Sequence, residues 1–119
     1  MSDELQNEIT PPVPITIGGK EYKLAFSNLS AIRFQQKTGK RLFDLSWKDA
    51  HSDPEVSTAL LWSALQDHHP EITFEQAARL YYPKNYMRVA KAIAEAWKNC
   101  MPEADALPNV GAQPVALTQ

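Results

Sequence analysis

Cysteine is almost absent from this 119-residue chain, which contains Cys100 and no other. A lone thiol cannot form a disulfide within the chain and cannot supply the thiolate set of a structural zinc site. Long apolar runs are missing as well, since no stretch approaches the roughly 18 residues that cross a bilayer. The first ten residues carry acids where a secretory signal needs basic and then apolar residues. We therefore expect a protein that is neither membrane-spanning nor exported, and a reducing cytoplasm is compatible with it.

A dense cluster of positive charge is also lacking. All 12 Lys and Arg residues lie between residues 13 and 101 together with nine of the 14 acids, which gives this segment a charge of +3 in a chain of net charge −2. Binding of a polyphosphate by counterion release needs several basic groups that converge on one face. Nucleic acid is therefore not expected to be the main partner. Hydrophobic residues make up 44% of the chain, which is enough for one small folded domain.

Prolines divide the chain into three parts. Three of the nine lie between residues 11 and 14, and three more lie from residue 102 onward. Proline denies the backbone helix and sheet hydrogen bonds, and the C-terminal stretch has no apolar period that could repay the entropy of ordering it. The sequence predicts a flexible N-terminal tail over residues 1–12, a folded domain over residues 13–101 and a flexible C-terminal tail over residues 102–119.

The folded part is predicted to open with a β-hairpin. Two alternating segments flank Gly18 and Gly19, which reach positive φ without steric cost. A hairpin alone is only marginally stable in water, so its apolar face must be covered by helices. The residues expected on that face are Ile15, Ile17, Tyr22, Leu24 and Phe26.

Four helices are predicted to follow the hairpin. Their starts are marked by Ser27 or Asn28, by Asp53 before a proline, and by Thr73 in a Thr-x-x-Gln capping box. Gly39 supplies a left-handed stop for the first helix. The predicted helices cover residues 27–38, 53–68, 73–81 or 73–82, and 84–99, while residues 40–52 are predicted as an irregular connection that packs against the domain. The fold class is α+β and mainly helical.

Residues that could carry chemistry are few. His68 and His69 are adjacent, so on a helix they point about 100° apart and do not converge on a metal ion. We expect them at a helix end, where a partly charged imidazole faces the negative end of the dipole. Cys100 falls on the apolar stripe of the last helix, where burial would suppress its thiolate. The sequence thus predicts no enzyme, no catalytic residue, no cofactor and no metal site.

Aromatic residues are numerous for so small a domain. A chain of this size buries only about 65% of its unfolded surface, so some large side chains should stay accessible, where Trp and Tyr are favoured anchors for protein partners. Core packing is the alternative role for each of them. The residues predicted to bind a partner are Leu42, Phe43 and Trp47 in the connection and Tyr81 and Tyr82 at the end of the third helix.

Four segments together resemble the tail assembly chaperones of long-tailed bacteriophages, related prophages and gene transfer agents. The first is Ile15 to Phe26, with the form Gly-x-x-Tyr-x-Leu-x-Phe, and the others are Ala31 to Lys40, Ala59 to Leu65 and Pro70 to Ala77. The similarity covers about residues 13–100. It implies a non-enzymatic protein in the cytoplasm of the bacterial host cell. Such a protein binds the tape measure protein, keeps it soluble and assists polymerisation of the tail tube protein around it.

Two alternatives and the oligomeric state stay open. One alternative is a structural virion protein, such as a head-tail connector or a tail completion protein. The other is a small nucleic-acid-binding regulator that grips a duplex with basic residues such as Lys84, Arg88 and Lys91. Self-association through exposed aromatic residues is compatible with a protein that coats a long ligand.

Overall fold

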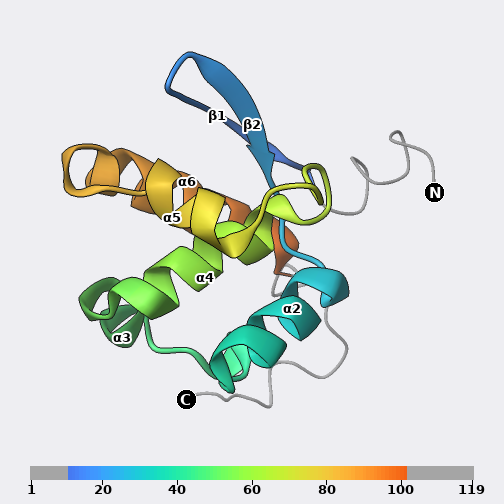
Figure 1. Cartoon of the computed structure of the whole chain (residues 1–119). Helices are drawn as coiled ribbons and strands as arrows, with labels where there is room; N and C mark the ends of the chain where they lie inside the picture. The colour runs from blue at the N-terminus through green and yellow to red at the C-terminus, as the bar shows by residue number, and fades with distance from the viewer. Residues whose placement is uncertain (1–10, 102–119) are drawn as a thin grey trace.

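A computed structural model describes residues 11–101, apart from the side chains of Trp47, Asp49 and His51. In this part of the chain a two-stranded hairpin precedes a group of helices (Figure 1). The elements are β1 (Val13–Ile17), β2 (Lys20–Leu24), α2 (Asn28–Thr38), α3 (Trp47–Ser52), α4 (Pro54–Leu65), α5 (Phe74–Leu80) and α6 (Tyr86–Cys100), with 3₁₀ turns at Leu42–Asp44 and Pro83–Asn85. The predicted α+β, mainly helical fold is confirmed. Apart from residues 11 and 12, the predicted tails lie outside the described residues.

The hairpin forms as its alternating pattern predicts. Strands β1 and β2 pair antiparallel with Ile15 opposite Tyr22, and Gly18 and Gly19 turn the chain with φ of 61° and 82°. All five residues predicted for the inner face are buried. A hydrogen bond joins α6 to β1, in which Arg88 of α6 donates to the Thr16 carbonyl.

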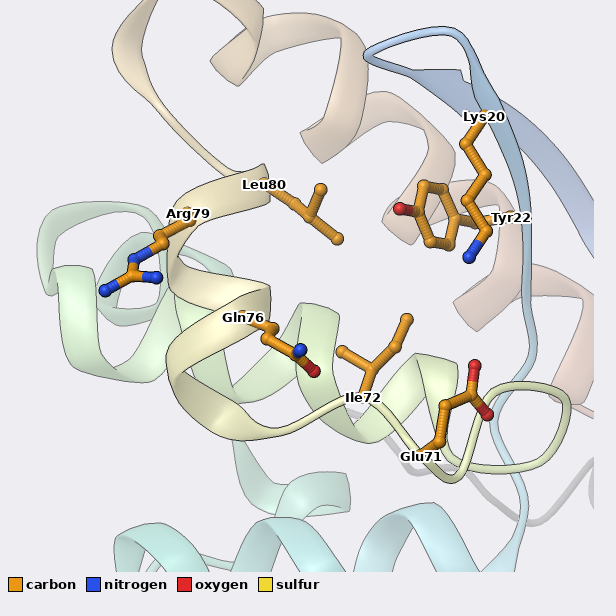
Figure 2. Close-up of a pocket in the computed structure, with 7 residues that line it drawn as sticks. All are labelled: Lys20, Tyr22, Glu71, Ile72, Gln76, Arg79 and Leu80. Carbon is orange, nitrogen blue, oxygen red and sulfur yellow. The ribbon is translucent and has the colours of Figure 1, made fainter.

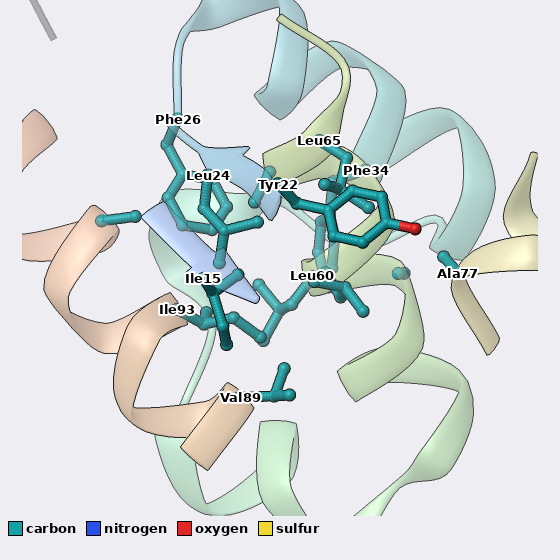
Figure 3. Packing of buried hydrophobic residues seen from close by; sticks show 14 of the residues in the cluster. Ile15, Tyr22, Leu24, Phe26, Phe34, Leu60, Leu65, Ala77, Val89 and Ile93 are labelled. Atoms are coloured by element: carbon teal, nitrogen blue, oxygen red, sulfur yellow. The ribbon is translucent and has the colours of Figure 1, made fainter. Parts of the chain in front are cut away.

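Helix α4 is the centre of the core. It contacts β2 and the helices α2, α3, α5 and α6. Figure 3 shows Leu60 and Leu65 of α4 among hairpin residues such as Leu24 and among Val89 and Ile93 of α6. Each large apolar side chain buried in this way contributes about 1.5–3 kcal/mol. This helix lies within the predicted helix over residues 53–68. No helix among residues 11–101 is long and apolar enough to cross a membrane.

Local signals fix where the helices begin and end. Ser27 and Ser30 form a reciprocal capping box at the start of α2, and Thr73 and Gln76 form another at the start of α5 with N···O distances of 2.9 and 3.1 Å. Gly39 ends α2 in the left-handed conformation with φ of 76°. These caps satisfy backbone groups that a helix end otherwise leaves without partners.

Residues 40–52 differ from the prediction. This segment is not an irregular connection, because it contains the 3₁₀ turn Leu42–Asp44 and the six-residue helix α3. A helix this short shows less than two turns of periodicity, so it gives almost no signal in the sequence. Helix α4 also ends at Leu65 rather than near His68, and residues 66–68 continue as turns, with the His69 N–H bonded to the Leu65 carbonyl at 2.7 Å.

We predict that Gly39→Ala lowers the free energy of unfolding by about 1 kcal/mol, because alanine is strained at positive φ. No atom lies within 4 Å of the position that a Cβ would take, so the loss comes from the backbone conformation alone. Asparagine tolerates this conformation better, so Gly39→Asn should lose less. Urea denaturation measures both variants, and equal stabilities of the two would contradict the prediction.

Candidate functional site

The residues predicted to bind a partner lie in different environments. Leu42 is only 1% exposed, so the prediction that it binds a partner is wrong. The 3₁₀ turn rotates successive side chains apart, which sends Leu42 into the core and Phe43 outward, where it is 52% exposed. Trp47 begins α3, and its side chain lies outside the described part of the structure.

Phe43 covers the C-terminal end of α6. Its ring lies 5.4 Å from the ring of Trp97 at an angle of 38°, and Trp97 in turn packs edge-on against Phe26 at 5.6 Å. One face of the Phe43 ring therefore packs on half-buried Trp97, and the rest of the ring is accessible. This patch is a single aromatic side chain on a packed support.

A larger apolar surface surrounds Tyr81 and Tyr82. The open cavity there has a volume of about 460 Å³. Its lining consists of Pro54, Ser57, Thr58, Tyr81, Tyr82, Pro83, Tyr86 and Met87, and contains no charged residue. We call these eight residues the tyrosine groove. Tyr82 is 41% exposed and Met87 is 78% exposed, so the groove presents large apolar side chains to solvent.

Two tyrosines form the wall of the tyrosine groove. The rings of Tyr81 and Tyr86 are stacked, with centroids 5.1 Å apart and planes 12° from parallel. Burial raises the pKa of the Tyr81 phenol well above its ordinary value, and the neighbouring Tyr86 raises it further. The Tyr81 hydroxyl is therefore uncharged at any physiological pH. A stacked pair of rings gives the groove an apolar side that loses little conformational entropy on binding.

Asn85 holds this segment in place. Its side chain is 5% exposed, accepts a hydrogen bond from the Tyr82 N–H at 3.0 Å and donates one to the Leu80 carbonyl at 2.8 Å. Tyr81 and Tyr82 are extended, so the Asn85 amide supplies partners for the Tyr82 N–H and the Leu80 carbonyl, while the Tyr82 carbonyl accepts from the Asn85 N–H at 3.0 Å. Asn85 thus positions the two tyrosines between α5 and α6.

The apolar surface continues along α6. A second open cavity of about 820 Å³ is lined by Tyr86, Met87, Arg88, Ala90, Lys91 and Ala94, and we call these residues the α6 shelf. Tyr86 and Met87 belong to both the tyrosine groove and the α6 shelf, so the two form one continuous surface. From Tyr86 to Ala94 this surface extends about 12 Å along the helix axis.

The structure does not bring the two predicted patches together. Tyr86 and Trp97 are eleven residues apart on α6, which separates the tyrosine groove from the Phe43 patch by about 16 Å along the helix. Asn85 and Met87 were not among the predicted site residues. Asn85 is visible in the sequence only as an asparagine before a helix, and Met87 stands one position away from the apolar stripe of α6.

A smaller cavity of about 330 Å³ lies between the hairpin and α5 (Figure 2). Tyr22, Ile72 and Leu80 point into it and give it an apolar floor. The Arg79 guanidinium at its edge points away, toward Glu75, with which it forms an ion pair at 3.2 Å. The other charged residues of its lining are Lys20 and Glu71, and Gln76 is engaged in the capping box of α5.

His69 has a structural role that the sequence did not indicate. Its Nε2 accepts a hydrogen bond from the Lys23 N–H at 3.0 Å, and its ring packs edge-on against Tyr22 at 5.3 Å. An imidazole that accepts in this way is neutral, so the predicted partly charged histidine at a helix end is wrong for His69. Burial lowers the pKa of His69, Glu71 opposes this effect, and His68 and the lysines nearby reinforce it.

The remaining chemistry-bearing residues do not form a site. Burial raises the pKa of the Cys100 thiol, as the sequence predicts, and the Sγ lies 3.1 Å from the Trp97 carbonyl. Within the described residues, no group of three or more His, Cys, Asp or Glu side chains could hold a metal ion. The surface with the clearest shape for binding is thus the tyrosine groove with the α6 shelf.

Comparison with known proteins adds no relative. No family model, no curated protein and no solved structure matches this chain.

We predict that Asn85→Ala lowers the free energy of unfolding by about 1–3 kcal/mol, because it leaves the Tyr82 N–H and the Leu80 carbonyl without partners. Asn28→Ala serves as a matched control, since Asn28 is exposed in α2 and should change stability by less than about 0.5 kcal/mol. Urea denaturation measures both, and near-UV circular dichroism reports the environment of the tyrosines. A loss no larger than in the control would show that Asn85 does not hold this segment.

The protein is predicted to lose stability as the pH falls. His69 has a lowered pKa in the folded state. At pH values between that pKa and about 6.5, the unfolded chain therefore binds more protons than the folded protein. Its stabilising contribution is present above pH 6.5 and is lost as the pH falls through the folded-state pKa. Thermal midpoints at pH 7.5 and 5.0 should therefore differ less in His69→Gln, which keeps an acceptor but does not titrate. An equal difference in both proteins would refute this role of His69.

Proposed function

We propose that this protein is a tail assembly chaperone of the kind found in long-tailed bacteriophages and prophages. In this role it binds the tape measure protein in the cytoplasm of the bacterial host cell and keeps it soluble while the tail tube protein polymerises around it. It works by binding alone, without a cofactor and without catalysing a reaction. The proposal combines the resemblance of residues 13–100 with one structural observation.

That observation is the continuous apolar surface formed by the tyrosine groove and the α6 shelf. A tape measure protein is largely a long amphipathic helix, whose apolar stripe aggregates unless another surface covers it. Two turns of such a helix are about 11 Å long, which matches the 12 Å of this surface along α6. The absence of charge from the lining of the tyrosine groove suits an apolar stripe, since no ion has to be desolvated.

The form of the surface also suits a chaperone. Both cavities are open, and the most exposed residue, Met87, is flexible and adapts to different apolar partners. Such a surface binds many similar segments weakly, and a long client offers many of them in series. The bound protein can then be displaced when the tail tube forms.

The two alternatives receive less support. Of the basic residues that could bind a duplex, Arg88 already donates a hydrogen bond to the Thr16 carbonyl and so joins α6 to β1. A nucleic-acid-binding regulator would bind DNA at low ionic strength. A structural virion protein would remain in the finished particle, where mass spectrometry of purified virions would detect it.

We predict that Tyr82→Ser combined with Met87→Ser abolishes solubilisation of the tape measure protein on co-expression. Loss of two exposed apolar anchors should weaken binding at least about tenfold. The client is the product of the largest neighbouring open reading frame, and the measurement is its soluble fraction and its co-purification with the tagged chaperone. Because both side chains are exposed, the variant should keep its thermal midpoint.

Ile32→Ser is the matched control, since Ile32 is 53% exposed on α2 and lines neither the tyrosine groove nor the α6 shelf. It should solubilise the client as well as the natural sequence does. If the client never co-purifies with the natural protein, the function is wrong. If it co-purifies equally with the double variant, the function stands and the assigned surface is wrong.

A further inference from the structure

A second groove with different chemistry lies between α2 and the chain that leads into α5. It has a volume of about 370 Å³. Leu29, Arg33 and Lys37 of α2 form one wall, Trp62 of α4 and the following Gln66 form the floor, and residues 70–74 form the other wall. We call these residues the basic groove.

The two cations of the basic groove have no acidic partner. Within residues 11–101 neither Arg33 nor Lys37 forms an ion pair, and α2 contains no Asp or Glu. The Lys37 ammonium instead lies over aromatic rings, 4.4 Å from the centroid of Phe74 and 5.9 Å from that of Trp62. Two like charges four residues apart on a helix repel each other, so an anion placed between them would relieve this repulsion.

An exposed aliphatic side chain lies in line with these charges on α2. Leu29 is 41% exposed and shares a helical stripe with Arg33 and Lys37, at spacings of four residues. The face of α2 therefore presents one exposed leucine in line with two cations, next to a groove lined by Trp62 and Phe74.

We infer that the basic groove docks an acidic amphipathic helix of a partner protein. The apolar stripe of that helix would lie on Leu29 and the aromatic floor, and its carboxylates would meet Arg33 and Lys37. Arg33 can bind a carboxylate with two parallel hydrogen bonds, while Lys37 can leave the aromatic rings for a full negative charge. The inference does not depend on the proposed function, because none of these residues belongs to the tyrosine groove or the α6 shelf.

Nucleic acid fits the basic groove less well. A duplex is gripped by many phosphate contacts, and only two cations converge here. A phosphate backbone also has no apolar stripe to cover the exposed Leu29. Glu71, on the wall opposite α2, would repel phosphates, whereas an amphipathic helix can turn a neutral side toward it.

Helix α5 separates the basic groove from the tyrosine groove. Phe74 at its start belongs to the basic groove, and Tyr81 directly after its end belongs to the tyrosine groove. The seven residues of α5 span about 10 Å, so two ligands can be bound at the same time. The protein thus has one surface for an uncharged apolar stripe and another for an acidic one.

The test uses a labelled helical peptide of four Glu-Leu-Ala-Ala repeats, with the corresponding Lys-Leu-Ala-Ala peptide as a control, in fluorescence anisotropy at low salt. The natural protein should bind the Glu peptide at least about tenfold more tightly than the Lys peptide. Arg33→Glu combined with Lys37→Glu should weaken binding of the Glu peptide at least tenfold. Leu29→Ser should weaken it several-fold, which charge attraction alone would not produce.

The matched control combines Lys84→Glu with Lys98→Glu, which changes the net charge equally at exposed residues outside the basic groove and should leave binding within about twofold. Tyr82→Ser with Met87→Ser should also leave it unchanged. Equal losses in the two charge-reversed variants would overturn the inference, as would tighter binding of a short DNA duplex that depends on Arg33 and Lys37. If the Glu peptide binds only after deletion of residues 1–10, the groove is not a site for another protein but for this chain's own acidic end. All variants change exposed side chains, and circular dichroism confirms that they fold.

Discussion

Burial of helix α4 on almost every side is the constraint that places the other elements. Nine of its twelve residues are buried, so the hairpin and four helices must pack around it. A two-stranded hairpin has too little apolar surface to be stable alone. Here the Ala25 N–H joins the Ala64 carbonyl of α4 at 2.9 Å, which ties the end of β2 to the central helix. Buried hydroxyls such as that of Ser63 are tolerated because they donate to carbonyls one turn earlier in the same helix.

The candidate site follows from how the chain passes over α4. Helix α5 packs across α4, and the chain must then reverse within a few residues to begin α6. Pro83 prevents a continuous helix through this reversal, so Tyr81 and Tyr82 are left extended at the surface. The buried amide of Asn85 supplies the hydrogen bonds that a helix would have provided. Large apolar side chains therefore stay exposed without loss of backbone pairing, which is what a binding surface requires.

The two grooves of this small domain differ in chemistry, and the two proposed binding roles rest on that difference. The tyrosine groove has no charge in its lining, while the basic groove carries Arg33 and Lys37 without acidic partners among the described residues. Both are open and shallow, so each favours weak and exchangeable binding. For a protein that accompanies a long client during assembly, weak contacts repeated along the client are more useful than one tight contact.

Features that depend on neighbouring residues could be predicted from the sequence, and features that depend on distant ones could not. The hairpin, the cap at Ser27 and the stop at Gly39 were predictable because each rests on residues a few positions apart. The same information could not separate Leu42 from Phe43, since both are apolar and only packing against α2 turns one inward and the other outward. The sequence alone determined the order and the ends of most elements and marked Tyr81 and Tyr82 as candidate binding residues, of which Tyr82 is exposed and Tyr81 is half-buried. Only the tertiary structure decided that Asn85 holds the two tyrosines beside α6 as part of a groove. That groove is made by α4, the chain reversal around Pro83 and α6 together, and no local pattern in the sequence encodes how three segments meet.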